Sequence, residues 1–297
     1  MSLWSVQSGA FWLGRHPTEA KMTLSVNTNH AALIALENLN NTQSQLTSTQ
    51  NMISTGLAVN TAKDNASVWA IAQGQRADIS ALDSVKMSLD RATSIADVAS
   101  TAGQSISDLL TQVKQKVVAA MDPSINTTSR LALNSDYTSL LNQIKDVINN
   151  ATFDGANLLN GSLSQDIQFL ANSDGSTFIT LSQKNMSLGG SIITMAATSS
   201  ITTVTMATAL LTQVNSSLAN VDSALGQLGS QSSEISQHNV FVGKISDVLQ
   251  TGVGNLVNAD MAKESARLQA LQVQQQLGTQ ALSIANQSPQ VILSLFK

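Results

Sequence analysis

Apolar residues recur at alternating intervals of three and four along two long stretches of the chain. This is the heptad spacing of a helix that packs lengthwise on another helix. The first stretch contains Leu82, Val85, Leu89, Ala92, Ala96, Ala99, Gly103, Ile106, Leu110, Val113 and Val117, and the second contains Leu211, Val214, Leu218, Val221, Leu225 and Leu228. A single amphipathic stripe cannot cover itself, so both stretches predict helix–helix packing and a function in assembly.

Breaks in the spacing define further helices. Gly56 interrupts a helix near the start of the chain, and Pro123 ends a long one because proline cannot donate to the helical ladder. The expected helices are one ending near Gly56, then 66–120, 130–150, 206–250 and, after Gly252 and Gly254, 260–286. The first and last helices carry thin seams, formed by Leu39, Leu46 and Ile53 in the first and by Leu268, Leu271, Leu277 and Ile284 in the last.

Strand signals are confined to the middle of the chain. The segments 166–171 and 176–183 flank the turn sequence 172–175, which predicts a β-hairpin with glycine in its turn. The predicted fold is therefore mainly α, an elongated antiparallel helical bundle or coiled coil with a small β-hairpin region in mid-chain.

The same boundaries predict six segments. They are a leader or tag-like segment (1–21), an N-terminal coiled-coil segment (22–65), core helices (66–150), a β-hairpin and exposed variable region (151–205), a core helix (206–250) and a C-terminal coiled-coil segment (251–297). The leader differs from the rest because it holds Trp4 and Trp12, two of the three tryptophans. It lacks the features of a cleaved secretory signal. A short added interaction segment is the alternative interpretation.

Composition argues against several function classes. Only 11% of residues are charged and 3% are aromatic, so the chain is poor in the side chains of compact enzyme cores. The net charge is −4 and no cluster of Lys or Arg could follow a phosphate backbone, so no nucleic-acid partner is expected. No apolar run is long enough to predict membrane insertion. The absence of cysteine excludes disulfides and thiolate chemistry.

Candidate catalytic and ligand-binding residues are few. His16, His30 and His238 are isolated in the sequence, and surface positions are expected for them. The pairs Asp78/Asp83 and Asp97/Asp108 are predicted on solvated helix faces rather than in a catalytic site. We therefore expect no catalytic residue, no cofactor and no metal site.

Three motifs resemble those of a known family. STGLAVNTAKDNASVWAIA (54–72) is similar to the amino-terminal signature of bacterial flagellins, and NLVNADMAKESARLQALQVQQQLGTQALSIANQSPQVILSLF (255–296) is similar to their carboxyl-terminal signature. ATFDGANLLNG (151–161) resembles the turn that follows their third core helix. The resemblance covers essentially all of 22–297.

The resemblance implies a self-assembling subunit of the flagellar filament, without catalytic activity, whose two ends pair as an inner coiled coil. It implies a homopolymer at the bacterial surface, export without a cleaved signal, and contacts with an export chaperone, cap proteins and hook–filament junction proteins. The seven residues of the thin terminal seams would then be the subunit interface.

Two other functions stay open at this point. One is a flagellin-like surface adhesin or polysaccharide-binding protein, for which the Ser/Thr-rich segment 191–208 could contact surface glycans. The other is a hook–filament junction protein, which shares helical ends with flagellin.

Overall fold

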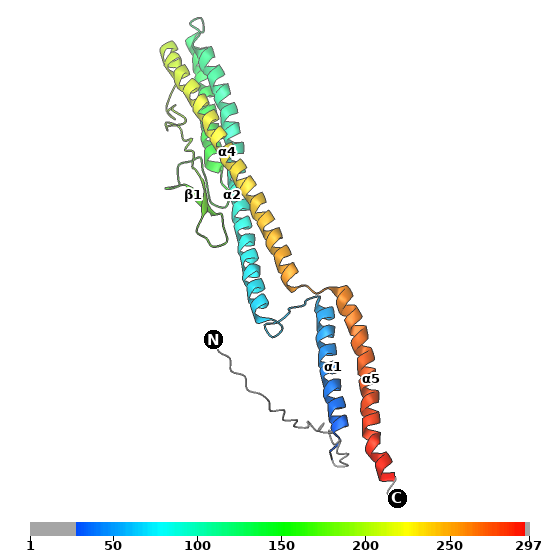
Figure 1. Ribbon diagram of the computed structural model, residues 1–297. Coiled ribbons are helices and arrows are strands. Elements are labelled where there is room, and N and C mark those ends of the chain that lie inside the picture. The colour runs from blue at the N-terminus through cyan, green and yellow to red at the C-terminus, as the bar shows by residue number, and fades with distance from the viewer. Residues whose placement is uncertain (1–27, 295–297) are drawn as a thin grey trace, which may run out of the picture. The chain divides into compact units, whose positions relative to one another are not determined.

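The computed structural model describes residues 28–294, which form five helices and one two-stranded sheet. In chain order the elements are α1 (His30–Thr55), α2 (Ala66–Ala120), α3 (Thr127–Asn150), β1 (Ile167–Leu170), β2 (Phe178–Leu181), α4 (Val204–Val257) and α5 (Met261–Ser294) (Figure 1). The predicted mainly α fold with one small hairpin is confirmed. The predicted leader, 1–21, lies outside the described residues.

The chain divides into two compact units. One contains α1 and α5 and comprises the residues up to 60 and those from 259 onward; the other, 61–258, contains all the remaining elements. In the larger unit, α2 packs lengthwise on α4 and also contacts α3 and β1 (Figure 1). The α2–α4 pair is antiparallel, since Ser107 bonds Asp222 near one end of the contact and Asp90 bonds Asn239 farther along.

The predicted seam of α2 is buried along its whole length. Every position from Leu82 to Val117 in that series is buried, and Leu89, Ile106, Leu110 and Val113 are fully covered. At Gly103 a side chain of α4 lies close to the α2 backbone, because a Cβ added there would lie 2.6 Å from Cδ2 of Leu225. A larger residue at this position would therefore require the Leu225 side chain to move.

The seam of α4 is wider than the heptad pattern predicted. Val214, Val221 and Leu228 are buried as expected, but Leu211, Leu218 and Leu225 are only half-buried at the edge of the core. Leu210, Ser217 and Ala224 occupy the fully covered positions beside them. The difference arises because α4 is covered on two sides, by α2 and by the chain between the hairpin and α4.

The end of α4 also corrects the sequence-based boundary. The helix continues through Gly252 and Gly254 to Val257, seven residues beyond the predicted end. Each glycine costs about 1 kcal/mol of helix propensity relative to alanine. Val253 and Val257 are buried here and offset that cost by packing.

Polar side chains define the ends of several helices. Asn65 begins α2 by accepting the N–H of Val68, and Asp64 accepts the N–H of Thr61 in the turn before it. After α2, Arg130 donates to the carbonyls of Ala120 and Asp122, so carbonyls near the helix end are satisfied by a side chain of α3. α3 itself begins at Thr127, three residues before the predicted start, because Asn126 accepts the N–H of Ser129 and caps it.

The hairpin pairs β1 with β2 in antiparallel register, with Ile167 opposite Leu181 and Leu170 opposite Phe178. Asn172 organises the turn: its Oδ1 accepts the N–H of Thr177, and its amide donates to the hydroxyls of Ser176 and Thr177. The segment therefore forms a turn, as its sequence predicted.

The chain from the hairpin to α4 is not wholly exposed, contrary to the predicted variable region. Met186, Ile193, Met195 and Ile201 are fully buried in the core of the larger unit. Ser191, Thr194 and Thr198, which lie between them in the sequence, are exposed, and the Ser/Thr-rich composition therefore suggested an exposed loop.

Side chains of α4 hold this segment through a row of hydrogen bonds, here called the polar ladder. Its rungs join Ser217 to Thr194, Asn220 to the carbonyls of Ser191 and Ile192, Gln227 to Lys184, Gln231 to Ser182, and His238 to the carbonyl of Ala171. From one rung to the next, the residue numbers rise along α4 and fall along segment 171–194, so the segment lies antiparallel to α4.

Candidate functional site

The smaller unit is an antiparallel pair of helices, α1 and α5. Asn29 caps α1 by accepting the N–H of Ala32, and its amide also donates to the carbonyl of Ala285, 2.6 Å away. At the other end, Gly56 closes α1 in the left-handed conformation (φ 72°), and its carbonyl accepts the N–H of Ala259 at 2.9 Å. The pair is thus joined by hydrogen bonds at both ends.

Few side chains are buried between α1 and α5. Among residues with described side chains, Leu46 and Thr49 of α1 and Glu264 and Leu271 of α5 are the buried ones. Half of this set is polar. Gly278 lets Leu39 lie close, since a Cβ added there would be 3.2 Å from Cδ1 of Leu39. A pair that buries so little is weakly stabilised by its own packing.

Large apolar side chains instead face outward on both helices. On α1 they are Leu33, Ile34 and Leu36, and on α5 they are Met261, Val273, Leu277 and Ile284. Ile284 is 70% exposed and Leu277 58%. We expect exposed apolar side chains in this number to mark a surface that associates with other molecules.

The seven predicted interface residues fall into three groups. Leu46 and Leu271 are buried between the two helices of one chain. Leu39, Ile53 and Leu268 are half-buried, and Leu277 and Ile284 are exposed. The exposed residues of α1, from Leu33 to Leu36, were missed because the sequence analysis counted only the residues that repeat every seven positions.

In the larger unit, residues 61–258, the acidic pairs considered in the sequence analysis do not lie in a buried site. Asp78, Asp83, Asp97 and Asp108 are all exposed. No group of three or more His, Asp or Glu residues within 28–294 could hold a metal ion. His238 is part-buried rather than a surface residue, because its Nε2 bonds the carbonyl of Ala171 at 2.7 Å and its ring lies beside Phe241.

Three pKa shifts in the larger unit have structural causes. Hydrogen bonds from Ser124 lower the pKa of the Asp122 carboxyl, and those from Ser176 lower the pKa of the Asp174 carboxyl. Burial raises the pKa of the Tyr137 hydroxyl, although its hydrogen bond with Ser199 acts in the opposite direction. All three groups form turn or packing contacts, so the shifts describe local structure.

None of the described helices is both long enough and apolar enough to cross a membrane.

Comparison with known proteins decides the family. The bacterial flagellin N-terminal helical region matches residues 26–164, and the bacterial flagellin C-terminal helical region matches residues 211–296. The chain belongs to the bacterial flagellins. This flagellin is 51% identical to flagellin FljJ of Caulobacter vibrioides, over 93% of this chain and 99% of the relative. It is 38% identical to a flagellin of Brucella melitensis, over 92% of this chain and 99% of that one.

A solved structure shares the fold at low sequence identity. A putative flagellar hook-associated protein from Vibrio parahaemolyticus aligns with a TM-score of 0.56 and 12% identity, covering 66% of this chain and all of that one. The family membership supports a structural protein that polymerises with other flagellin subunits into the extracellular flagellar filament.

Proposed function

We propose that the α1–α5 pair is the surface through which this flagellin joins the inner part of the filament, with Leu39, Leu46, Ile53, Leu268, Leu271, Leu277 and Ile284 at or beneath the subunit interface. The observation that carries the proposal is the contrast between the few side chains buried inside the pair and the large apolar ones exposed on it. Polymerisation would then gain about 25 cal/mol of free energy for each Å² of apolar surface that it buries. Leu46 and Leu271 hold the pair together, while Leu277 and Ile284 meet other copies.

Substitutions on the outer face of α5 test this proposal. Leu277→Glu and Ile284→Glu place a charge on an exposed apolar position, so the monomer should keep its helix content while seeded polymerisation is lost. Gln274→Glu, an exposed position of the same helix, is the matched control and should polymerise normally. Circular dichroism and electron microscopy of each variant measure the two properties. Filaments of normal length from both apolar-site variants would contradict the proposed surface.

Further partners follow from membership in the family. We propose that an export chaperone holds the weakly packed ends before assembly, and that cap proteins and hook–filament junction proteins bind the same helices at the two limits of the filament. The subunit is exported without a cleaved signal and performs no catalysis. Support comes from the exposed apolar side chains of α1 and α5, which need cover in the monomer.

Contact with surface glycans is a second candidate function of the larger unit. A groove beside the hairpin, about 550 Å³ in volume, is lined by amide and hydroxyl side chains that include Gln183, Asn220 and Ser223. Such groups donate to and accept from sugar hydroxyls. Titration of filaments with soluble polysaccharides, compared for wild type and Ser223→Ala, tests this second role.

A further inference from the structure

The sulfur of Met206, in the first turn of α4, accepts two hydrogen bonds. The hydroxyls of Ser200 and Thr202 donate to it at 3.7 and 3.6 Å, and neither hydroxyl has another partner within residues 28–294. No other methionine sulfur in this part of the chain accepts a hydrogen bond. Because a thioether is only a weak acceptor, both donors keep most of their capacity for a stronger one.

The backbone that carries these two hydroxyls is held in place by contacts with α3. Ile201, which lies between them in the sequence, is fully buried, and its N–H donates to Oδ1 of Asn134 at 2.8 Å. Ser199, just before them, is hydrogen-bonded to the hydroxyl of Tyr137. The two donors are therefore positioned beside the Met206 sulfur before any ligand or modification is present.

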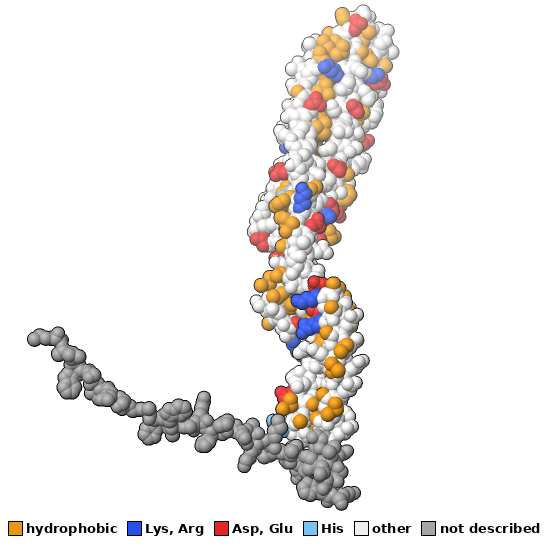
Figure 2. Space-filling model, turned by 45° about the vertical axis from the view of Figure 1, so that its right-hand side comes forward, with side chains coloured by type: hydrophobic (Ala, Val, Ile, Leu, Met, Phe, Trp, Pro, Cys, Tyr) orange, Lys and Arg blue, Asp and Glu red, His pale blue; other side chains and the backbone are white. Residues whose placement is uncertain are grey.

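Met206 is also accessible to small molecules in solution. Its residue is 49% exposed, compared with 74% for Met87 and 43% for Met261, whereas Met186 and Met195 are fully buried. Figure 2 shows orange side chains, a colour that includes methionine, at the surface of both units. Exposure alone therefore does not distinguish Met206 from the other two exposed methionines, but the two hydroxyls do.

We propose that Met206 is a site of oxidation by hydrogen peroxide, and that the hydroxyls of Ser200 and Thr202 bind the oxygen of the resulting sulfoxide. In this step a lone pair of the sulfur attacks one peroxide oxygen and the O–O bond breaks. The other oxygen takes the proton of the attacked oxygen and leaves as water. The sulfur is oxidised by two electrons, and the peroxide is reduced.

The two hydroxyls favour the sulfoxide over the thioether. Negative charge develops on the transferred oxygen as the S–O bond forms, and donors already at the site stabilise that charge more than they stabilise the neutral sulfur. One additional neutral hydrogen bond corresponds to about a fivefold increase in rate. The sulfoxide oxygen would then connect Ser200 and Thr202 to the first turn of α4 through stronger bonds than the sulfur accepts.

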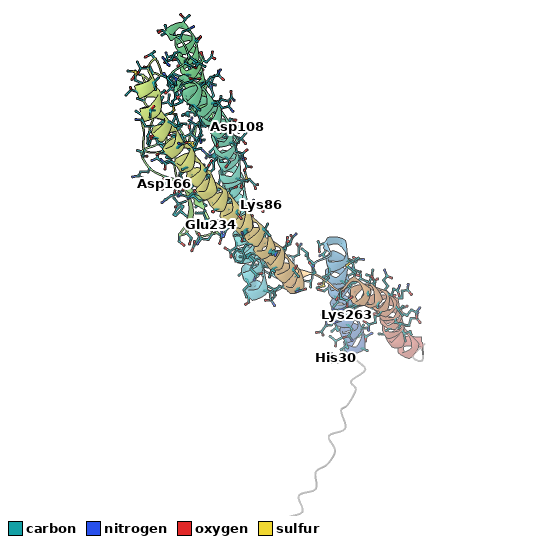
Figure 3. The ribbon with its side chains drawn as sticks, turned by 90° about the horizontal axis from the view of Figure 1, so that it is seen from above. His30, Lys86, Asp108, Asp166, Glu234 and Lys263 are labelled. Carbon is teal, nitrogen blue, oxygen red and sulfur yellow. The ribbon has the colours of Figure 1, made fainter. Side chains whose placement is uncertain are left out.

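Two exposed methionines of the same chain serve as internal controls. Met87 follows Lys86 on α2, and Met261 lies two residues before Lys263 on α5; Figure 3 labels both lysines. The full-length monomer is treated with dilute hydrogen peroxide, and peptide mass spectrometry follows the gain of oxygen at each methionine. We expect Met206 to be oxidised at least about fivefold faster than Met261, whose exposure is similar, and also faster than the more exposed Met87.

Removal of the hydroxyls tests their role. In the double variant Ser200→Ala/Thr202→Val, oxidation of Met206 should slow by about fivefold or more, while the rates at Met87 and Met261 stay unchanged. Thr202→Ser keeps a hydroxyl and should behave like wild type. Thr202→Val alone replaces the hydroxyl by a methyl group of similar size, and it should slow Met206 severalfold even where the double variant does not fold.

Three results would overturn the proposal. They are rates that follow exposure, with Met87 fastest; an unchanged rate at Met206 in both Thr202→Val and the double variant; and equal slowing at all three methionines, which would reflect a general change in the protein. The monomer is used throughout, so none of these results depends on the proposed assembly surface.

Discussion

At the scale of single residues, the contact between α2 and α4 depends on side-chain size. Ala92, Ala96, Ala99 and Gly103 are buried along α2, and small side chains there let α4 lie close. Gly103 and Gly74 lie in the same helix but in different surroundings. Gly103 faces Leu225 at a distance that excludes a Cβ without movement, whereas nothing lies within 4 Å of a Cβ at Gly74.

The same substitution should therefore have opposite effects at the two glycines. Gly103→Leu would overpack the seam and lower the free energy of unfolding by about 1–3 kcal/mol. Gly74→Leu should raise it by up to about 1 kcal/mol, because leucine has the higher helix propensity and open space is available. Thermal and denaturant unfolding of the two variants measures both changes. A loss of similar size at both positions would contradict the close approach of α4.

Charge at a buried seam position should be far more costly than charge at an exposed one. Leu110 is fully buried, so Leu110→Asp should cost several kcal/mol or open the helices locally. Asn142 is exposed on α3, and Asn142→Asp should change stability by less than about 0.5 kcal/mol. Equal shifts in melting temperature for the two variants would show that the seam assignment is wrong.

At the scale of elements, the polar ladder of α4 fixes where the hairpin segment lies. Its side chains bond mostly to the backbone of the segment, so these hydrogen bonds add to the apolar contacts of Met186 and Ile193 in fixing where the segment lies along α4. Gln231 forms one rung with two hydrogen bonds: its Oε1 accepts the N–H of Ser182, and its amide donates to the Ser182 hydroxyl. Loss of a buried hydrogen bond typically costs about 1 kcal/mol.

Gln231→Ala should loosen the hairpin segment while leaving the helices intact. We expect faster amide exchange over 167–194 and unchanged exchange in the centre of α2, measured by hydrogen–deuterium exchange. Gln237→Ala is the matched control, because Gln237 is exposed and bonds Ser233 within its own helix. Uniform acceleration in both variants would show that the ladder does not position the segment.

The buried residues of α2 that face α4 were predictable from the sequence, and those of α4 were predicted only in part. The seam of α2 follows a strict heptad because one stripe meets α4 along its length. In α4 the same pattern misplaced Leu218 and Leu225, since Ser217 and Ala224 are covered by the segment after the hairpin. Nothing in the local sequence shows that Ser217 is buried. The hydrogen bond that its hydroxyl accepts comes from the backbone N–H of Thr194, which lies in another part of the chain.

On the candidate assembly surface, formed by α1 and α5, some features were likewise predictable from the sequence and others were not. Its helices and the thin apolar rows on them follow from spacing and from the flagellin signatures. The burial of Glu264 does not, because a glutamate in the first turn of a helix is ordinarily a solvated residue that favours the helix dipole. Only the structure shows that its Oε2 is buried without a hydrogen bond.

At the scale of the whole molecule, the two units differ in how they are stabilised. The hydrophobic core lies within 61–258, where α2, α3, α4 and the hairpin segment contribute to one continuous cluster. The α1–α5 unit buries few residues and exposes many apolar ones. We therefore expect the larger unit to fold without the smaller one, and the smaller one to gain its main stabilisation from other copies.

Seeded polymerisation followed by electron microscopy tests the central claim most directly, comparing the full-length chain with residues 61–258. The account predicts long filaments from the full-length protein. It predicts that 61–258 stays monomeric in sedimentation while keeping the helical circular dichroism of a folded unit. Filaments formed by 61–258, or the absence of filaments from the full-length chain under the same conditions, would contradict it.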